Sequence, residues 1–446
     1  MRIDESTIAN GITVELLAEL ISKHEGRNQH FTKLRDYYMG KHAIENRRRE
    51  NKSTANNKII CNHAKYIVDM GQSYLTGNPI TYAASEEYDI EALKDTYSEQ
   101  DISSLDSELV KHMNIYGRAY ELIYADGEAK PKSVYLPSEQ AFVVYAQSAD
   151  KKPLFGVYYY KRYDIHGSCI GVVCNVYDSE NTYTYESRQE SYSSMELTET
   201  AAHYFGGVPL IEYQNNSERQ GDFEQLIPLI DAYNLLCSDR VNDKEQFVNS
   251  FLFLSGVEVD SEQAKKLKEE RILMGYEGSE AKYLSKVMQE SDIKILRDDL
   301  KDDIHRFSMV PDLSDESFGN NLSGVAIKYK LLGFEQLIKN KERYFAKGLK
   351  ERFRLYNNYL VLKNSMGIVP VHRIDVVFTY NLPANELEIS QMIANLQNIV
   401  SSETLLDRIP FVSDAKEEAE LVKAEQTDGY RRKIESISDV AEGGGY

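Results

Sequence analysis

Four aspartates lie close together in one segment of the sequence, where they could support metal chemistry. They are Asp298, Asp299, Asp302 and Asp303, within the run SDIKILRDDLKDDIHRF. Paired carboxylates can hold two divalent ions that cleave a phosphodiester bond. A metal-dependent nuclease or packaging enzyme is therefore one hypothesis for this segment.

The spacing of the same segment favours a different interpretation. A stripe of apolar residues at helical spacing predicts an amphipathic helix: Ile293, Leu296, Leu300, Ile304 and Phe307. Asp298 and Asp302 then lie opposite the stripe, while Asp299 and Asp303 flank it. Basic residues are interleaved with them: Lys294, Arg297 and Lys301. The simplest interpretation is a solvent-exposed helix face. A third interpretation, besides the metal site, is a negatively charged surface facing a partner that must not bind to it.

The sequence lacks the usual catalytic motifs. It contains no P-loop, GxGxxG, HExxH or GxSxG pattern, and its nine histidines show no ligand spacing. The four cysteines, Cys61, Cys169, Cys174 and Cys237, form no CxxC pair. We expect them to be reduced thiols of a cytosolic protein, and we expect no cofactor.

Charge and hydropathy exclude several classes of protein. The formal net charge of −19 argues against a surface that grips nucleic acid throughout, because phosphate binding needs clustered Lys and Arg. A short basic cluster around Arg47–Arg49 is either a surface patch or a contact with nucleic acid or an acidic subunit. The N-terminus lacks the apolar core of a signal peptide, and no apolar run reaches the ~20 residues that span a bilayer. We therefore expect no membrane insertion.

The remaining sequence supplies the elements that must position these segments. Helical periodicity dominates residues 1–110, whereas residues 115–215 are short β-rich runs with a hairpin signal at Asp126–Gly127. We interpret these runs as an antiparallel sheet. Helices then return, a small mixed unit follows at 251–288, and a long helix extends to Leu362. One more strand and a helical, charged C-terminus complete an α+β chain.

Apolar stripes predict which helix faces are buried. In the first helix the stripe is Leu16, Leu17, Leu20 and Ile21. In the helix that follows the sheet it is Leu226, Ile230, Tyr233, Cys237 and Val241. In the long helix it is Ile327, Leu331, Phe334, Ile338, Phe345, Leu349, Tyr356 and Leu360. Between the last two helical patterns lies a polar segment, Met309–Gly324, in which Pro311 disfavours continuation of the preceding helix. Loops this long are usually functional or disordered.

Three segments resemble one family of structural proteins. They are Tyr37–Tyr82, Leu226–Phe247 and Val310–Glu335, and the last is the most specific, with PDLSDESF followed by NNLSGVAIKYK. The chain resembles the portal proteins of tailed bacteriophages with long non-contractile tails. The order of the expected elements agrees with that family over nearly the whole chain.

The resemblance implies an α+β, portal-type elongated subunit with long helices, an antiparallel β-rich wing region and a small mixed α/β clip. It divides the chain, in order, into a wing (1–222), a stem helix (223–249), the clip (250–289), a second stem helix (290–308), a tunnel loop (309–324), a kinked long helix with a returning wing strand (325–383), and a helical crown with a flexible C-terminus (384–446).

The resemblance also implies a function and a set of partners. Such proteins form a ring, usually of about twelve subunits, at one capsid vertex, through which DNA is packaged and ejected. The implied partners are further copies of the chain, double-stranded DNA, the terminase large subunit, a head–tail adaptor, and the major capsid and scaffolding proteins. The implied location is the virion, with assembly in the host cytoplasm. The ring would have no enzymatic activity and no membrane contact. A prophage-derived cytoplasmic scaffold is the remaining alternative.

Three groups of site residues follow from the resemblance. The DNA-facing tunnel loop would include Asp312, Asp315, Glu316, Ser317, Asn320 and Asn321. The acidic stem face would turn Asp298, Asp299, Asp302 and Asp303 toward the lumen. The clip would contact terminase and adaptor through Lys265, Lys266, Lys268 and Arg271. Because the loop has no Lys or Arg, we expect weak, sequence-blind contacts with DNA rather than a charged clamp.

Overall fold

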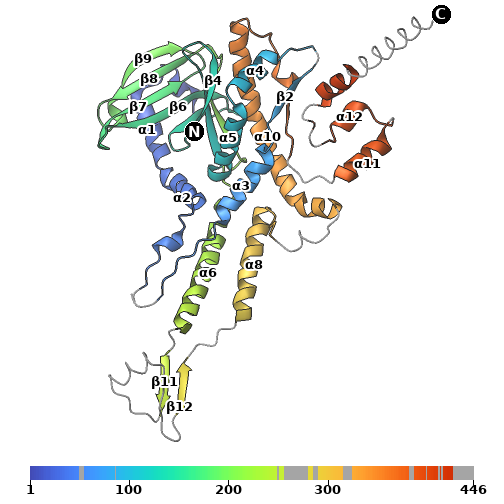
Figure 1. Cartoon of the computed structure of the whole chain (residues 1–446). Helices are drawn as coiled ribbons and strands as arrows, with labels where there is room; N and C mark the ends of the chain where they lie inside the picture. Colours follow the sequence, from blue (N-terminus) through green and yellow to red (C-terminus); the bar gives the residue numbers. More distant parts are fainter. Residues whose placement is uncertain are drawn as a thin grey trace, which may run out of the picture. The chain divides into compact units, whose positions relative to one another are not determined.

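A computed structural model of the chain describes residues 1–49, 55–85, 87–248, 251–255, 280–284, 290–314, 324–380, 386–397, 399–409, 412 and 415–424 (Figure 1). The chain forms two compact units. Unit 1 comprises Met1–Tyr38, Lys65–Glu224 and Ser308–Tyr446, and unit 2 comprises Met39–Ala64 and Gln225–Phe307. Both helices and antiparallel sheets are present, which confirms the predicted α+β class.

Unit 1 contains most of the secondary structure. Its helices are α1 (Val14–Glu25), α2 (Asn28–Tyr38), most of α3 (His63–Thr76), α4 (Glu91–Glu99), α5 (Ile102–Tyr116), α10 (Gly324–Leu362), α11 (Glu386–Leu396) and α12 (Ser402–Leu406). Its strands are β1 (Arg2–Ile3), β2 (Thr81–Ala84), β3 (Arg118–Ala125), β4 (Pro131–Leu136), β5 (Ala141–Ala146), β6 (Pro153–Tyr163), β7 (Cys169–Tyr177), β8 (Asn181–Ser187), β9 (Glu196–Ala202), β10 (Leu210–Gln214) and β13 (Ile374–Val377). The helical first hundred residues and the following sheet region are as predicted.

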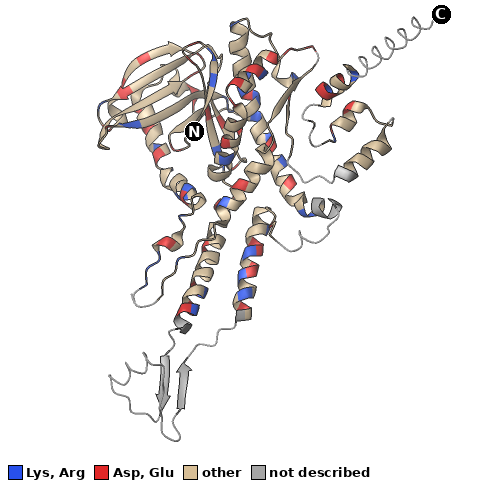
Figure 2. Cartoon of the chain, in the orientation of Figure 1, with Lys and Arg blue, Asp and Glu red and all other residues tan. Residues whose placement is uncertain are grey.

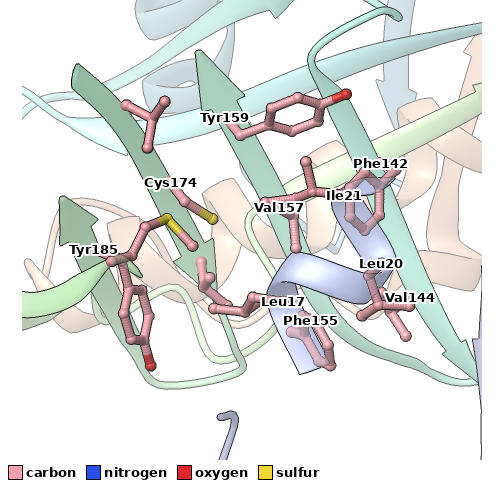
Figure 3. Packing of buried hydrophobic residues seen from close by; sticks show 13 residues of the cluster. Leu17, Leu20, Ile21, Phe142, Val144, Phe155, Val157, Tyr159, Cys174 and Tyr185 are labelled. Carbon is pink, nitrogen blue, oxygen red and sulfur yellow. The ribbon is translucent and has the colours of Figure 1, made fainter. Parts of the chain in front are cut away.

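The larger sheet of unit 1 has six strands in the order β1-β5-β6-β7-β8-β9. All neighbours are antiparallel except β1, which pairs with β5 in parallel and which the sequence did not predict. Helix α1 packs on this sheet through Leu17, Leu20 and Ile21, which confirms three positions of its predicted stripe (Figure 3). Burial of each such side chain contributes roughly 1.5–3 kcal/mol. Thr13 caps the helix by accepting a hydrogen bond from the backbone N–H of Leu16 at 3.3 Å.

Strand β5 is buried on both faces and joins two cores. Phe142 and Val144 face α1, whereas Ala141 and Val143 belong to a second cluster with the sheet β10-β3-β4. Burial on both faces explains why this strand is an uninterrupted apolar run rather than an alternating one. The β3–β4 hairpin lies where it was predicted, but its left-handed residue is Ala129 (φ 55°) rather than Gly127.

The long helix α10 is anchored in unit 1 along its predicted stripe. Every stripe residue whose side chain is described is at most 7% exposed: Leu331, Phe334, Ile338, Phe345, Leu349, Tyr356 and Leu360. Gly348 allows the helix to approach β10, because a Cβ atom there would lie 2.3 Å from Cε1 of Tyr213. The helix ends at Leu362, as the pattern predicted.

A buried charge cluster fixes the second half of α10. Arg352 is fully buried, and its Nε donates to both carboxylate oxygens of Glu121 at 2.8 and 2.9 Å. Its Nη1 donates to Oδ1 of Asp106 at 2.6 Å, and the Tyr213 hydroxyl donates to Glu121 at 2.5 Å. Burial raises the pKa of Asp106 to about 6, although Arg352 opposes that shift. The cluster ties α10 to α5 and β3.

In the described part of unit 2 there are two long helices, a short 3-10 helix (Ala43–Asn46) and one small sheet. The long helices and the strands are α6 (Ile227–Val248), β11 (Phe251–Ser255), β12 (Glu280–Leu284) and α8 (Glu290–Ser308). Strands β11 and β12 pair antiparallel, so the mixed unit expected between the helices contains a two-stranded ribbon. Among the described residues, no helix is both long enough and apolar enough to cross a membrane. The four cysteines form no disulfide with one another in the structure.

Candidate functional site

Helices α6 and α8 of unit 2 lie side by side (Figure 1), and α8 carries four of the five predicted site residues that the structure describes: Asp298, Asp299, Asp302 and Asp303. His63 connects them, because its ring meets Tyr233 of α6 edge-on at 4.9 Å and His305 of α8 at 5.8 Å. Between the two helices, the described part of the chain contains the strands β11 and β12.

One face of α6 is polar and buried, which the sequence did not predict. Asn234, Ser238 and Asn242 are fully buried. They accept hydrogen bonds from the backbone N–H groups of Cys61 (2.8 Å), Ile59 (2.9 Å) and Asn57 (2.7 Å), respectively. Alternate residues of the segment 57–61 are thus hydrogen-bonded to every fourth residue of α6. The two repeats match, because two extended residues advance ~6.6 Å and four helical residues ~6.0 Å. By contrast, Val241 of the predicted apolar stripe is 40% exposed.

The basic cluster at Arg47–Arg49 is partly used within the chain. Arg47 and Arg49 both donate to Oδ1 of Asp239 on α6, at 2.5 and 2.9 Å. Two of the three arginines are therefore held against the same helix as the 57–61 segment.

The four predicted aspartates lie on helix α8, along which acidic and basic residues are interleaved (Figure 2). Asp298 accepts from its neighbour Arg297 at 2.8 Å, and Asp303 pairs with Arg306 at 3.3 Å. Asp299 and Asp302 are exposed. Across the parts of the chain that the structure describes, no three His, Cys, Asp or Glu side chains gather in a way that could hold a metal ion.

The apolar stripe of α8 is only partly buried within the chain. Ile304 is fully buried, whereas Leu296 is 51% and Phe307 63% exposed. Ile295, beside the stripe, is 59% exposed. The helix therefore offers both acidic and apolar side chains that the described residues leave exposed.

The segment after α8 begins as predicted. Met309 adopts a left-handed conformation (φ 59°) where the helix stops. The hydroxyl of Tyr66, on α3, donates to the carbonyl of Pro311 at 2.8 Å and accepts from the N–H of Leu313 at 3.3 Å. Asp312 accepts from the backbone and hydroxyl of Ser314 at 3.0 and 2.7 Å. The start of the predicted tunnel loop is thus fastened to α3, a contact that no sequence signal indicated.

The other predicted site residues lie outside the described part of the chain. In the tunnel loop these are Asp315, Glu316, Ser317, Asn320 and Asn321, and in the clip they are Lys265, Lys266, Lys268 and Arg271. Their roles remain predictions.

Comparison with known proteins identifies the family. Residues 17–430 match the model of the phage portal protein family, SPP1 Gp6-like. The portal protein of Bacillus phage SPP1 is 26% identical over 417 residues, which cover 87% of this chain and 82% of the relative. The portal protein of Clostridium phage phiCD119 is 22% identical over 452 residues, covering 93% and 96%. Portal proteins are structural proteins rather than enzymes, in agreement with the prediction. The chain belongs to the SPP1 Gp6-like family of phage portal proteins.

Proposed function

We propose that this portal protein forms a closed ring at one capsid vertex and that double-stranded DNA passes through the ring during packaging and ejection. The exposed surface of α8 carries the proposal. Apolar side chains that one copy leaves uncovered, such as Leu296 and Phe307, are suited to a head-to-tail contact with the next copy. A heterologous contact of this kind closes into a ring when its rotation allows it.

The acidic face of α8 suits a channel wall. DNA binds strongly wherever Lys and Arg neutralise its phosphates, because counterions are released. A wall that lets DNA slide should instead carry negative charge, as Asp299 and Asp302 do. We therefore assign α6 and α8 to the stem, with Asp298, Asp299, Asp302 and Asp303 facing the lumen.

The 57–61 segment belongs with the stem in this proposal. It lies in the same compact unit as α6 and α8, and three backbone hydrogen bonds join it to α6. The clip between the helices would dock the terminase large subunit and later the head–tail adaptor, and residues 309–324 would line the narrowest part of the channel. Assembly with scaffolding and major capsid proteins would take place in the host cytoplasm.

Charge reversal on α8 tests the DNA-facing role. Replacing Asp299 and Asp302 with Lys should leave rings intact but slow DNA packaging, since each added cation creates a salt-dependent phosphate contact. The matched control is Glu196→Lys with Glu199→Lys on β9, whose residues are all exposed. The measurement is the fraction of DNA-filled heads when each variant replaces the parent protein. Equal filling by both variants would refute the lumen-facing orientation.

A further inference from the structure

Unit 1 contains a pocket of about 400 Å³ that the portal function does not explain. Its lining comes from β1, β3, β5, β10 and the residues around the end of α1. Four arginines line it, namely Arg2, Arg27, Arg118 and Arg219, together with a single carboxylate, Glu212. The pocket therefore has an excess of positive charge.

The one carboxylate is already engaged. Arg219 donates from Nε to Oε1 of Glu212 at 2.7 Å and from Nη2 to Oε2 at 3.4 Å. This contact neutralises one guanidinium. Within the described residues, no salt bridge neutralises Arg2, Arg27 or Arg118. Three further guanidinium groups therefore share the pocket with one carboxylate that is already paired; Arg2 and Arg27 are exposed, and Arg118 is half-buried.

One buried donor in the lining has no hydrogen-bond partner among the described residues, namely Nε of Arg118. Buried donors are nearly always paired, so this N–H is suited to an acceptor such as an oxyanion oxygen. His24 also lines the pocket and is only 1% exposed. The Tyr159 hydroxyl donates to the carbonyl of Glu139 and therefore accepts from Nδ1 of His24 at 2.8 Å, so Nε2 of the neutral ring carries no proton to donate to an anion.

The electrostatic character of the pocket is visible in its own titratable groups. Burial, with the positive charges of Arg27 and Arg118, lowers the pKa of His24 to about 3. The pKa of the Glu212 carboxyl is also lowered, although burial alone would raise it, because Arg219 and Arg118 lie close by. Both shifts are those expected of a positive potential.

We propose that this pocket binds a phosphate-class oxyanion. Planar guanidinium groups match the geometry of phosphate oxygens, and four guanidinium groups against one carboxylate suit a dianion better than a singly charged carboxylate. The pocket exceeds the size of inorganic phosphate, and Tyr120, Phe142 and Tyr145 also line it. The phosphate group can therefore come from free phosphate or from a nucleoside monophosphate.

Calorimetric titration of the full-length protein tests the proposal. Sodium phosphate should bind saturably at one site per chain, with sodium chloride at equal ionic strength as the blank. Loss of a charge-assisted hydrogen bond predicts roughly ten- to hundredfold weaker binding in Arg27→Gln and in Arg118→Gln. Arg27 is exposed, so its variant should fold normally, and exposed Arg188→Gln is the matched control with unchanged affinity.

A second pair of titrations, with deoxyadenosine monophosphate and with deoxyadenosine, tests whether the phosphate group belongs to a nucleotide. Tighter binding of the monophosphate than of inorganic phosphate supports a nucleotide as the source of the group, and equal binding supports free phosphate. The proposal is overturned if neither sodium phosphate nor deoxyadenosine monophosphate binds saturably, if deoxyadenosine binds as tightly as its monophosphate, or if both pocket variants retain the parent affinity.

Discussion

Replacing Arg352 with Met should strongly destabilise unit 1. The substitution keeps most of the side-chain volume but removes the guanidinium that serves two buried carboxylates, Asp106 and Glu121. Both carboxylates are at most 2% exposed, so water cannot take over the lost contacts. Removing one partner from a buried ion pair costs about 3–5 kcal/mol, because an uncompensated charge stays buried.

This loss of unfolding free energy should lower the melting temperature by a measurable amount. For a unit of more than 300 residues, 1 kcal/mol corresponds to roughly 1–2 °C, so Arg352→Met should melt roughly 3–10 °C below the parent. The control is Arg343→Met on the same helix, since Arg343 is exposed and its loss should cost within about 0.5 kcal/mol. Circular dichroism of both variants gives the comparison.

The pH dependence of the melting-temperature difference between Arg352→Met and the parent distinguishes an effect of buried charge from an effect of lost packing. Burial already raises the pKa of Asp106 to about 6, and removal of Arg352 should raise it further. A carboxyl whose folded pKa exceeds its unfolded pKa loses stability as pH rises through that window. The melting difference between variant and parent should therefore be larger at pH 8 than at pH 5. A difference that does not change with pH, or one no larger than that of Arg343→Met, would refute the electrostatic account.

Two further predictions concern the loop anchor and the α6 thiol. Tyr66→Phe removes two hydrogen bonds, together about 1–2 kcal/mol, so the Leu313 amide should exchange with solvent roughly 5- to 30-fold faster. Tyr329→Phe, which changes an exposed tyrosine, is the control for the hydrogen-exchange measurement. Unchanged exchange of the Leu313 amide in Tyr66→Phe would contradict the role of Tyr66 as an anchor. A hydrogen bond from Cys61 lowers the pKa of Cys237 to about 7, so its alkylation rate should be half-maximal near pH 7. In Cys61→Ala the midpoint should move upward, and an unchanged midpoint would exclude the thiol pair as its cause.

Apolar periodicity predicted the helices and their burial well. The stripe of α10 is buried at every described position, and the β-rich region forms the expected sheet. Such patterns are local, because a helix face repeats within a few residues and needs no knowledge of distant segments.

Long-range pairing was not predictable from the same information. Strand β13 pairs with β2 from the other end of the chain, and nothing in either short run specifies that partner. Arg352, Asp106 and Glu121 look like surface residues in the sequence, since only the fold brings them together in the core. Pairing of this kind depends on tertiary contacts rather than on local pattern.

Only the secondary structure around the candidate site was predictable. The helix that carries the four aspartates and its end before Pro311 are present, because both follow from local rules. The polar face of α6 was missed. Asn and Ser at helical spacing normally indicate a solvent-facing surface, and only the path of residues 57–61 turns that face into a buried one.

Electron microscopy of the purified protein tests the central claim most directly. Class averages should show closed rings with a central opening, since the exposed apolar side chains of α8 are proposed to be covered by a neighbouring copy. Replacing Leu296 and Phe307 with Ser removes the apolar contact with the neighbouring copy and should weaken the rings. Ile165→Ser, at an exposed loop position, should not. A parent protein that remains monomeric at high concentration, with no rings in the images, would contradict the account.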